Sequence, residues 1–131
     1  MEFSEPTVEN KQVVDITDRL QNIVTEAGLQ DGVCHAFVQH TTTALTTADL
    51  DPGTDLDMLD AFYKMVPKLH YRHPHNPKHT PDHIIATLIG PNVAVPVKEG
   101  TLQLGSWQRV VLFEFDGPRE RQITVNLVDA R

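Results

Sequence analysis

The last third of the chain consists of short apolar stretches separated by turns, and this feature constrains the fold most. The stretches cover residues 93–97, 102–104, 107–115 and 123–128. Turn sequences lie between them at residues 98–100 and 116–118. Strands that follow one another with connections this short pair side by side in opposite directions. The segment therefore predicts a mostly antiparallel sheet.

Upstream of these strands, apolar residues recur at helical spacing in three segments. They are residues 17–27, 54–66 and 81–89. A threonine suited to an N-cap stands at the start of each segment, namely Thr17, Thr54 and Thr80. Residues 13–16 are expected to form a short strand. A strand at 33–39 is apolar on both faces, so we expect it inside the sheet. The order predicts an α+β fold with about three helices.

Length and composition fit a single compact domain, residues 1–131. Hydrophobic residues make up 40% and charged residues 22% of the chain, a balance that excludes disorder. No apolar run is long enough to span a bilayer, and the N-terminus lacks the features of a secretory signal. The single cysteine, Cys34, has no partner for an internal disulfide. These features predict a cytoplasmic protein with no membrane partner.

The net charge of -7 argues against nucleic acid as a partner, because a duplex binder needs a basic face. The chain has neither a phosphate-binding P-loop nor a dinucleotide fingerprint, so we expect no nucleotide cofactor. An acidic total still allows a local anion site, and arginines gather at positions 109, 119 and 121.

Four of the seven histidines fall within residues 73–83. Histidine is suited to proton transfer near neutral pH and to metal binding. His79 and His83 are four residues apart, but the predicted helix starts between them, so helical geometry does not guarantee that they converge. Placement on a helix favours a functional role for His83. For His70, His73 and His75 a solvated loop is favoured over a functional site, because nothing in the sequence fixes their geometry. For His79 the two interpretations are about equally supported.

His40, Thr41 and Thr42 follow the predicted inner strand. An imidazole beside hydroxyl groups suits phosphate oxygens or a water molecule. The alternative is a threonine-rich turn with local hydroxyl-to-backbone bonds, which these residues alone favour.

The strand at 107–115 ends with a carboxylate on an apolar face. Alternation places Glu114 on the same side as Val110 and Leu112. A carboxylate in such a position is costly unless it is paired. Glu114 is therefore expected either to pair with an arginine or to belong to a site. Arg119 follows the next turn, and its guanidinium matches phosphate oxygens.

Taken together, the ordered motifs resemble the YjbQ-like family, often described as secondary thiamine-phosphate synthases. The matching motifs are Asp15-Ile16-Thr17, Gly32-Val33-Cys34 leading to His40-Thr41-Thr42, residues 102–108, residues 114–119, and His83 at a helix start. They span nearly the whole chain in the family's order. The resemblance implies an α+β fold and a homotrimer with sites near subunit boundaries. It also implies weak synthase activity that joins a pyrimidine pyrophosphate to a thiazole phosphate and releases pyrophosphate.

Two positions depart from the family pattern. Ala48 and Asp49 stand where the family usually has an Asn-Glu pair, so the carboxylate is kept but shortened and the amide is lost. His79 stands where the family tends to have asparagine, and an imidazole there could ligate a metal ion.

Three hypotheses follow. The first is the synthase, with His40, His83, Asp49 and Glu114 as catalytic residues, and its phosphorylated substrate bound by Thr41, Thr42, Gln108 and Arg119. A divalent ion, magnesium or zinc, would assist. The second is a zinc-dependent hydrolase with His40, His79 and His83 as metal ligands. The third is a non-catalytic trimeric protein that binds a small phosphorylated ligand.

Overall fold

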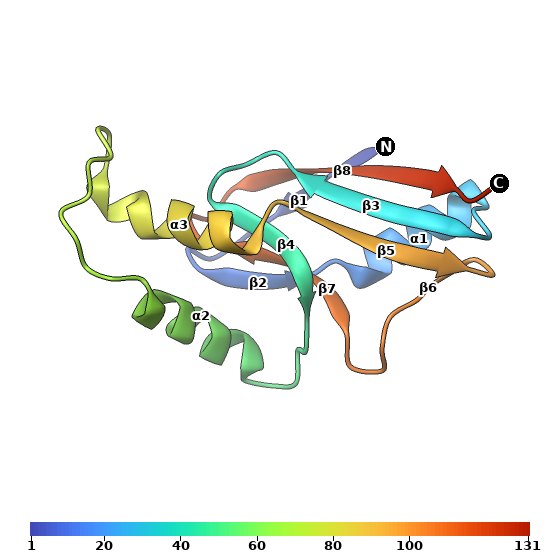
Figure 1. Cartoon of the computed structure of the whole chain (residues 1–131), viewed down its shortest axis with the longest axis horizontal. Helices are drawn as coiled ribbons and strands as arrows, with labels where there is room; N and C mark the ends of the chain where they lie inside the picture. The colour runs from blue at the N-terminus through green and yellow to red at the C-terminus, as the bar shows by residue number, and fades with distance from the viewer.

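A computed structural model describes all residues from 1 to 131. The elements in chain order are β1 (Glu2–Pro6), β2 (Gln12–Asp15), α1 (Thr17–Ala27), β3 (Gly32–Val38), β4 (Thr43–Ala48), α2 (Thr54–Met65), the 3-10 turn η1 (Pro77–His79), α3 (Thr80–Ile89), β5 (Asn92–Lys98), β6 (Thr101–Leu102), β7 (Arg109–Glu114) and β8 (Glu120–Asp129). Figure 1 shows the strands grouped together, with α2 and α3 projecting to one side.

The strands form two sheets in which every neighbouring pair is antiparallel. The larger sheet has the order β1-β8-β3-β5-β6, and the smaller one has the order β2-β7-β4. The α+β class, the antiparallel sheet and the three α-helices are confirmed. The inner position predicted for residues 33–39 is also confirmed, because β3 lies between β8 and β5.

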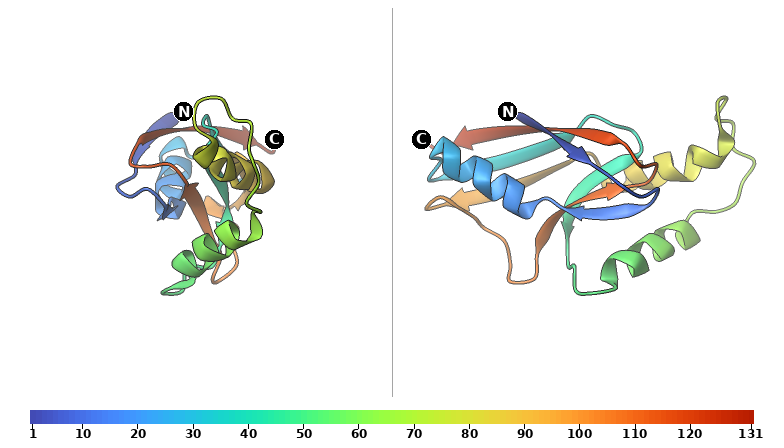
Figure 2. Two further views of the ribbon diagram at one scale, coloured as in Figure 1. Left: turned by 90° about the vertical axis from the view of Figure 1, so that its left-hand side faces the viewer. Right: turned by 180° about the vertical axis from the view of Figure 1, so that it is seen from behind.

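The smaller sheet separates two hydrophobic clusters. Leu45, Val110 and Leu112 face a main core shared with α1 and the larger sheet. Val111 and Phe113 face the other way, into a second cluster covered by α2 and α3. Both faces of β7 are thus buried, which explains its continuous apolar run. Figure 2 shows α1 and the α2–α3 pair at different ends of the molecule.

The helix starts differ from the predicted caps by one residue. Thr17, Thr54 and Thr80 are each the first helical residue, and the residues at the N-cap positions make no side-chain cap bond. The reason is clear for Thr17, whose Oγ1 instead accepts the backbone N–H of Val110 at 2.8 Å. The predicted end of α1 is correct, because Gly28 has φ 72°.

Two strands are absent from the sequence prediction. β1 forms one edge of the larger sheet and pairs with β8, and β4 pairs with β7. β4 contains only threonine, alanine and one leucine, so no alternation of apolar and polar residues marked it. The turn predicted around residues 41–43 is therefore shorter, because Thr43 already belongs to β4.

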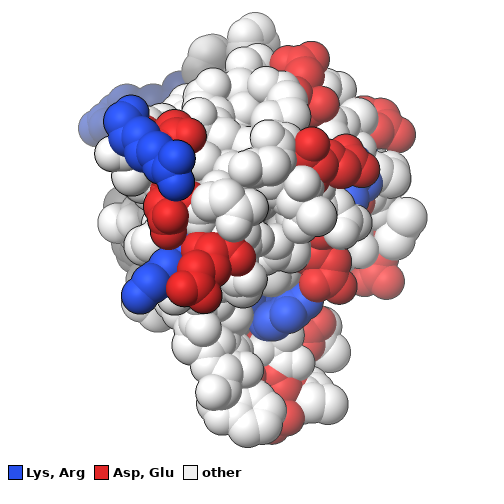
Figure 3. Space-filling view, turned by 90° about the vertical axis from the view of Figure 1, so that its right-hand side faces the viewer, with Lys and Arg blue, Asp and Glu red and all other residues white.

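The surface agrees with the overall acidic charge. Figure 3 shows one end of the molecule, where basic side chains occur in small groups among acidic ones and form no continuous basic patch. None of the helices has the length and apolar character needed to cross a membrane.

Candidate functional site

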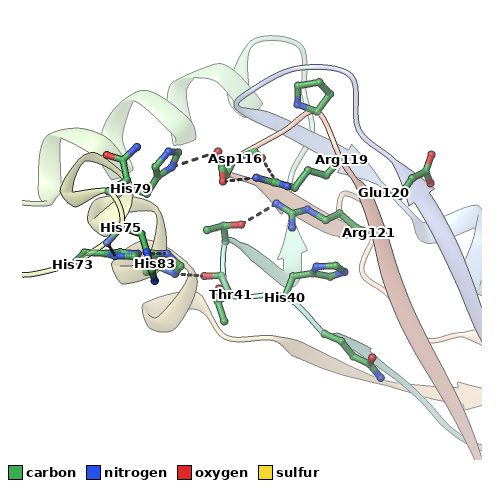
Figure 4. A pocket seen from close by; sticks show the side chains of 14 residues that line it. His40, Thr41, His73, His75, His79, His83, Asp116, Arg119, Glu120 and Arg121 are labelled. Carbon is green, nitrogen blue, oxygen red and sulfur yellow. Dashed lines mark hydrogen bonds and ion pairs between the residues drawn. The ribbon is translucent and has the colours of Figure 1, made fainter.

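One polar cavity of about 830 Å³ opens where three chain segments meet, and none of its fourteen lining residues is hydrophobic. The segments are the connection between β3 and β4, the histidine-rich stretch that leads into α3, and the connection between β7 and β8 (Figure 4). Strand register explains the meeting, because Val38 pairs with Ile123 and Thr43 pairs with Glu114. The connections that begin or end at these paired residues therefore lie at the same end of the two sheets.

Beneath this pocket lies a buried ion pair. Arg121 Nε donates to Glu114 Oε1 at 2.8 Å, and Arg121 Nη2 donates to Thr42 Oγ1 at 2.9 Å. Thr7 and the backbone N–H of Asp116 also donate to Glu114. Burial alone would raise the pKa of Glu114, but these hydrogen bonds outweigh it and lower the pKa. Glu114 thus has the arginine partner that its apolar position required.

His40 lies in the pocket wall with a fixed tautomer. Its Nε2 accepts the backbone N–H of Gln122 at 2.9 Å, which leaves the ring proton on Nδ1. Burial, together with the charges of Arg121 and Arg119, lowers the pKa of His40. His40 is therefore a neutral hydrogen-bond donor near pH 7, and its Nε2 already has a partner.

His83 and His73 lie side by side in the pocket. His83 Nδ1 faces the backbone oxygen of Thr41 at 3.2 Å, so it carries the proton and donates. Its unprotonated Nε2 lies within hydrogen-bond distance of His73 Nε2, at 3.3 Å. Apart from its place in the histidine cluster, no feature of the sequence distinguishes His73 from a solvated loop residue. The structure brings it into contact with His83.

His79 points to a different group of side chains. Its Nδ1 lies 3.1 Å from Asp82 Oδ2 and 3.4 Å from Asp116 Oδ1. Arg119 is half exposed and bonds Asp116 through its guanidinium. The predicted metal ligands His40, His79 and His83 do not form a group of this kind, whereas His79, Asp82 and Asp116 do. Asp82 and Asp116 were not singled out from the sequence, because only the fold brings them to His79.

Asp49 and Gln108 lie outside the polar pocket. Asp49 borders a separate cavity of about 280 Å³ together with Trp107 and Arg109. Gln108 donates to Thr47 Oγ1 at 2.9 Å. The reason is the path of β4, which starts beside Thr42 and carries the chain roughly 20 Å away at the usual rise per strand residue. Within a single chain, the residues predicted to form one site therefore lie in two separate regions of the surface.

Comparison with known proteins identifies the family. The family model described as UPF0047 protein YjbQ-like matches residues 2–130.

The chain belongs to the YjbQ-like UPF0047 family.

Relatives and solved structures agree with this assignment. A UPF0047 protein of Archaeoglobus fulgidus is 38% identical over 126 residues, which covers 95% of this chain and 98% of the relative. YugU of Bacillus subtilis is 31% identical, with 93% of both chains covered. The crystal structure of a YbjQ-like protein of unknown function from Sulfolobus solfataricus superposes with a TM-score of 0.91. It is 34% identical and covers 98% of this chain and 95% of its own.

Proposed function

We propose that this YjbQ-like protein is a thiamine-phosphate synthase-type transferase whose polar pocket binds the diphosphate of a pyrimidine substrate. The observation that supports the proposal most is the composition of the pocket. Hydrogen-bond donors and cations from His40, His83 and Arg119 face one cavity that has no hydrophobic lining. Such a cavity suits a strongly charged, well-hydrated group.

The reaction breaks the bond between the pyrimidine's methylene carbon and a diphosphate oxygen while the thiazole nitrogen bonds to that carbon. Negative charge builds up on the departing diphosphate. Donors fixed in advance around that charge lower the barrier. In this proposal the Nδ1–H of His40 and the guanidinium of Arg119 supply these donors. His83 supplies an imidazole whose tautomer is set by Thr41, and it serves as the acid-base group in the proposal.

Thr41, Thr42 and Glu114 also hold other side chains of the pocket in position, in addition to the roles predicted for them. Thr42 and Glu114 hold Arg121, and Thr41 orients His83 through its carbonyl. Magnesium would accompany the diphosphate, because it is usually bound by substrate phosphates and few protein ligands.

Asp49 and Gln108 enter the proposal through a homotrimer. In one chain Asp49 lines the second cavity together with Trp107, which is 77% exposed, and Gln108 follows Trp107 in the chain. The polar pocket is lined by no hydrophobic side chain that could hold a pyrimidine or a thiazole ring, whereas Trp107 offers an exposed aromatic face. A neighbouring subunit that placed this second cavity against the polar pocket would supply both the ring contact and Asp49.

The test is thiamine-phosphate formation from both precursors with magnesium, using the wild type, His83→Ala and a matched control, His70→Ala. His70 is exposed and does not line the pocket. We expect His83→Ala to lower the rate by ~10²–10⁴, the usual contribution of a placed acid-base group, and His70→Ala to keep the wild-type rate.

Equal product from the wild type and His83→Ala would contradict the catalytic assignment. Saturable binding of pyrophosphate without product under any metal condition would instead identify a phospho-ligand binding protein. Arg119→Ala should weaken pyrophosphate binding in either case.

A further inference from the structure

At one side of the polar pocket, three potential metal-ligating atoms converge on a single point. They are Nδ1 of His79, Oδ2 of Asp82 and Oδ1 of Asp116, and all lie within 4.8 Å of one another. The imidazole nitrogen is 3.1 Å from the first oxygen and 3.4 Å from the second. Figure 4 shows His79 and Asp116 facing each other across the rim of the pocket.

Each carboxylate is anchored by its outer oxygen. Asp82 Oδ1 receives hydrogen bonds from Lys11 Nζ at 2.9 Å and from Tyr63 Oη at 2.6 Å. Asp116 Oδ2 receives one from Arg119 Nη2 at 3.2 Å. These bonds hold both groups so that the inner oxygens point toward His79. The side chain of Asp82 is 4% exposed, and so its direction is fixed by packing as well.

Hydrogen bonding alone leaves this group incomplete. Nδ1 of a histidine carries at most one proton, which can serve one of the two inner oxygens well. Asp116 Oδ1 then lacks a good donor from the protein. A cation at the centre would contact all three atoms at once. In tetrahedral coordination, ligands about 2.0–2.2 Å from a zinc ion lie about 3.3–3.6 Å from one another, which is close to the two nitrogen-to-oxygen separations.

The local backbone holds His79 in place. The 3-10 turn η1 begins after Asn76, whose side chain accepts the backbone N–H of Lys78 and whose carbonyl accepts that of His79. Asp82 lies in the first turn of α3. Both ligands on this side therefore come from ordered backbone.

We infer that His79, Asp82 and Asp116 form a binding site for a divalent transition-metal ion. One imidazole and two carboxylates are a mixed nitrogen and oxygen set, which favours zinc or manganese over magnesium or calcium. Lys11 and Arg119 offset part of the carboxylate charge, which disfavours ions held by charge alone. His79 and Asp116 line the open pocket, so the remaining coordination positions face water or an anionic ligand.

This site is distinct from the zinc set predicted from the sequence and does not depend on the proposed reaction. Binding of the metal alone therefore tests it. Isothermal titration with zinc chloride and manganese chloride, on the full chain in a non-chelating buffer, compares the wild type with His79→Asn and Asp116→Asn. His83→Asn and His75→Asn are the matched controls, because they change imidazoles elsewhere in the same pocket.

We expect the wild type to bind one equivalent of metal. His79→Asn and Asp116→Asn should each weaken metal binding at least tenfold, because mutation of an outer-shell partner alone already lowers metal affinity by ~10–100-fold. Both controls should keep the wild-type affinity. The thermal unfolding of every variant, measured without metal, establishes that it is folded.

Three outcomes would overturn the inference. The wild type could bind neither metal at millimolar concentration. Affinity could survive both His79→Asn and Asp116→Asn. It could also be lost in His83→Asn and kept in His79→Asn, which would assign the ion to the His73–His83 pair.

Discussion

Two clusters of charged residues flank the end of β7, and they differ in how completely their members are paired. In the first, Glu114 is fully buried and both of its oxygens receive donors from Arg121, Thr7 or the backbone. In the second, His79 shares one Nδ1 between Asp82 and Asp116 at the rim of a cavity. A closed network serves the fold, whereas an incomplete one at a pocket can accept a ligand.

The largest effect is expected from opening the closed cluster. Arg121→Met leaves the Glu114 carboxylate buried without its charge partner, so we expect a loss of ~3–5 kcal/mol in the free energy of unfolding. Urea unfolding measures it. Arg119→Met is the control, because this arginine is half exposed and its ion pair is worth at most ~1 kcal/mol.

The same experiment can be sharpened with the double variant Arg121→Met, Glu114→Leu. Removing both charges together avoids an unpaired buried carboxylate, so the double variant should be more stable than Arg121→Met alone. Equal stability of these two variants would show that the pairing does not dominate the cluster.

A second, smaller effect is expected from acid. The pKa of Glu114 is lowered in the folded protein from its ordinary 4.5, so its stabilising contribution is complete above pH 4.5. The contribution is lost as the pH falls through the folded pKa. The stability difference between the wild type and Glu114→Gln should therefore narrow with acidification. Thermal unfolding of both proteins across this pH range measures it, and a constant difference would contradict the assignment.

The smallest effect concerns the open cluster. Burial, followed by the hydrogen bond to Asp82, raises the pKa of Tyr63 above its ordinary value, so its hydroxyl remains a donor at neutral pH. Tyr63→Phe removes one of two donors to Asp82 and should cost about 1–2 kcal/mol of unfolding free energy. Tyr71→Phe is the control, because its hydrogen bond to Pro67 is exposed. Equal losses in the two variants would mean that Tyr63 does not anchor Asp82.

Much of the framework was predictable from local patterns. Helical spacing located all three α-helices, and alternation along residues 110–114 showed that Glu114 needed a partner. The start of β4 was not predictable, because threonine and alanine fit a turn as readily as a buried strand. The helix caps were predicted one residue too late. At Thr17 the reason is tertiary, because its hydroxyl accepts a hydrogen bond from the backbone N–H of Val110 and is not available as a cap.

The sequence by itself determined the family, the α+β class and a chain segment rich in imidazoles. The tertiary structure decided which of those imidazoles have partners and what the partners are. His83 meets His73 and Thr41, whereas His79 meets Asp82 and Asp116. The physical reason is that the contacts with Thr41 and Asp116 join the histidine-rich segment to β-strand ends more than thirty residues away. Their geometry depends on strand register and helix packing, which residue spacing along one segment does not encode.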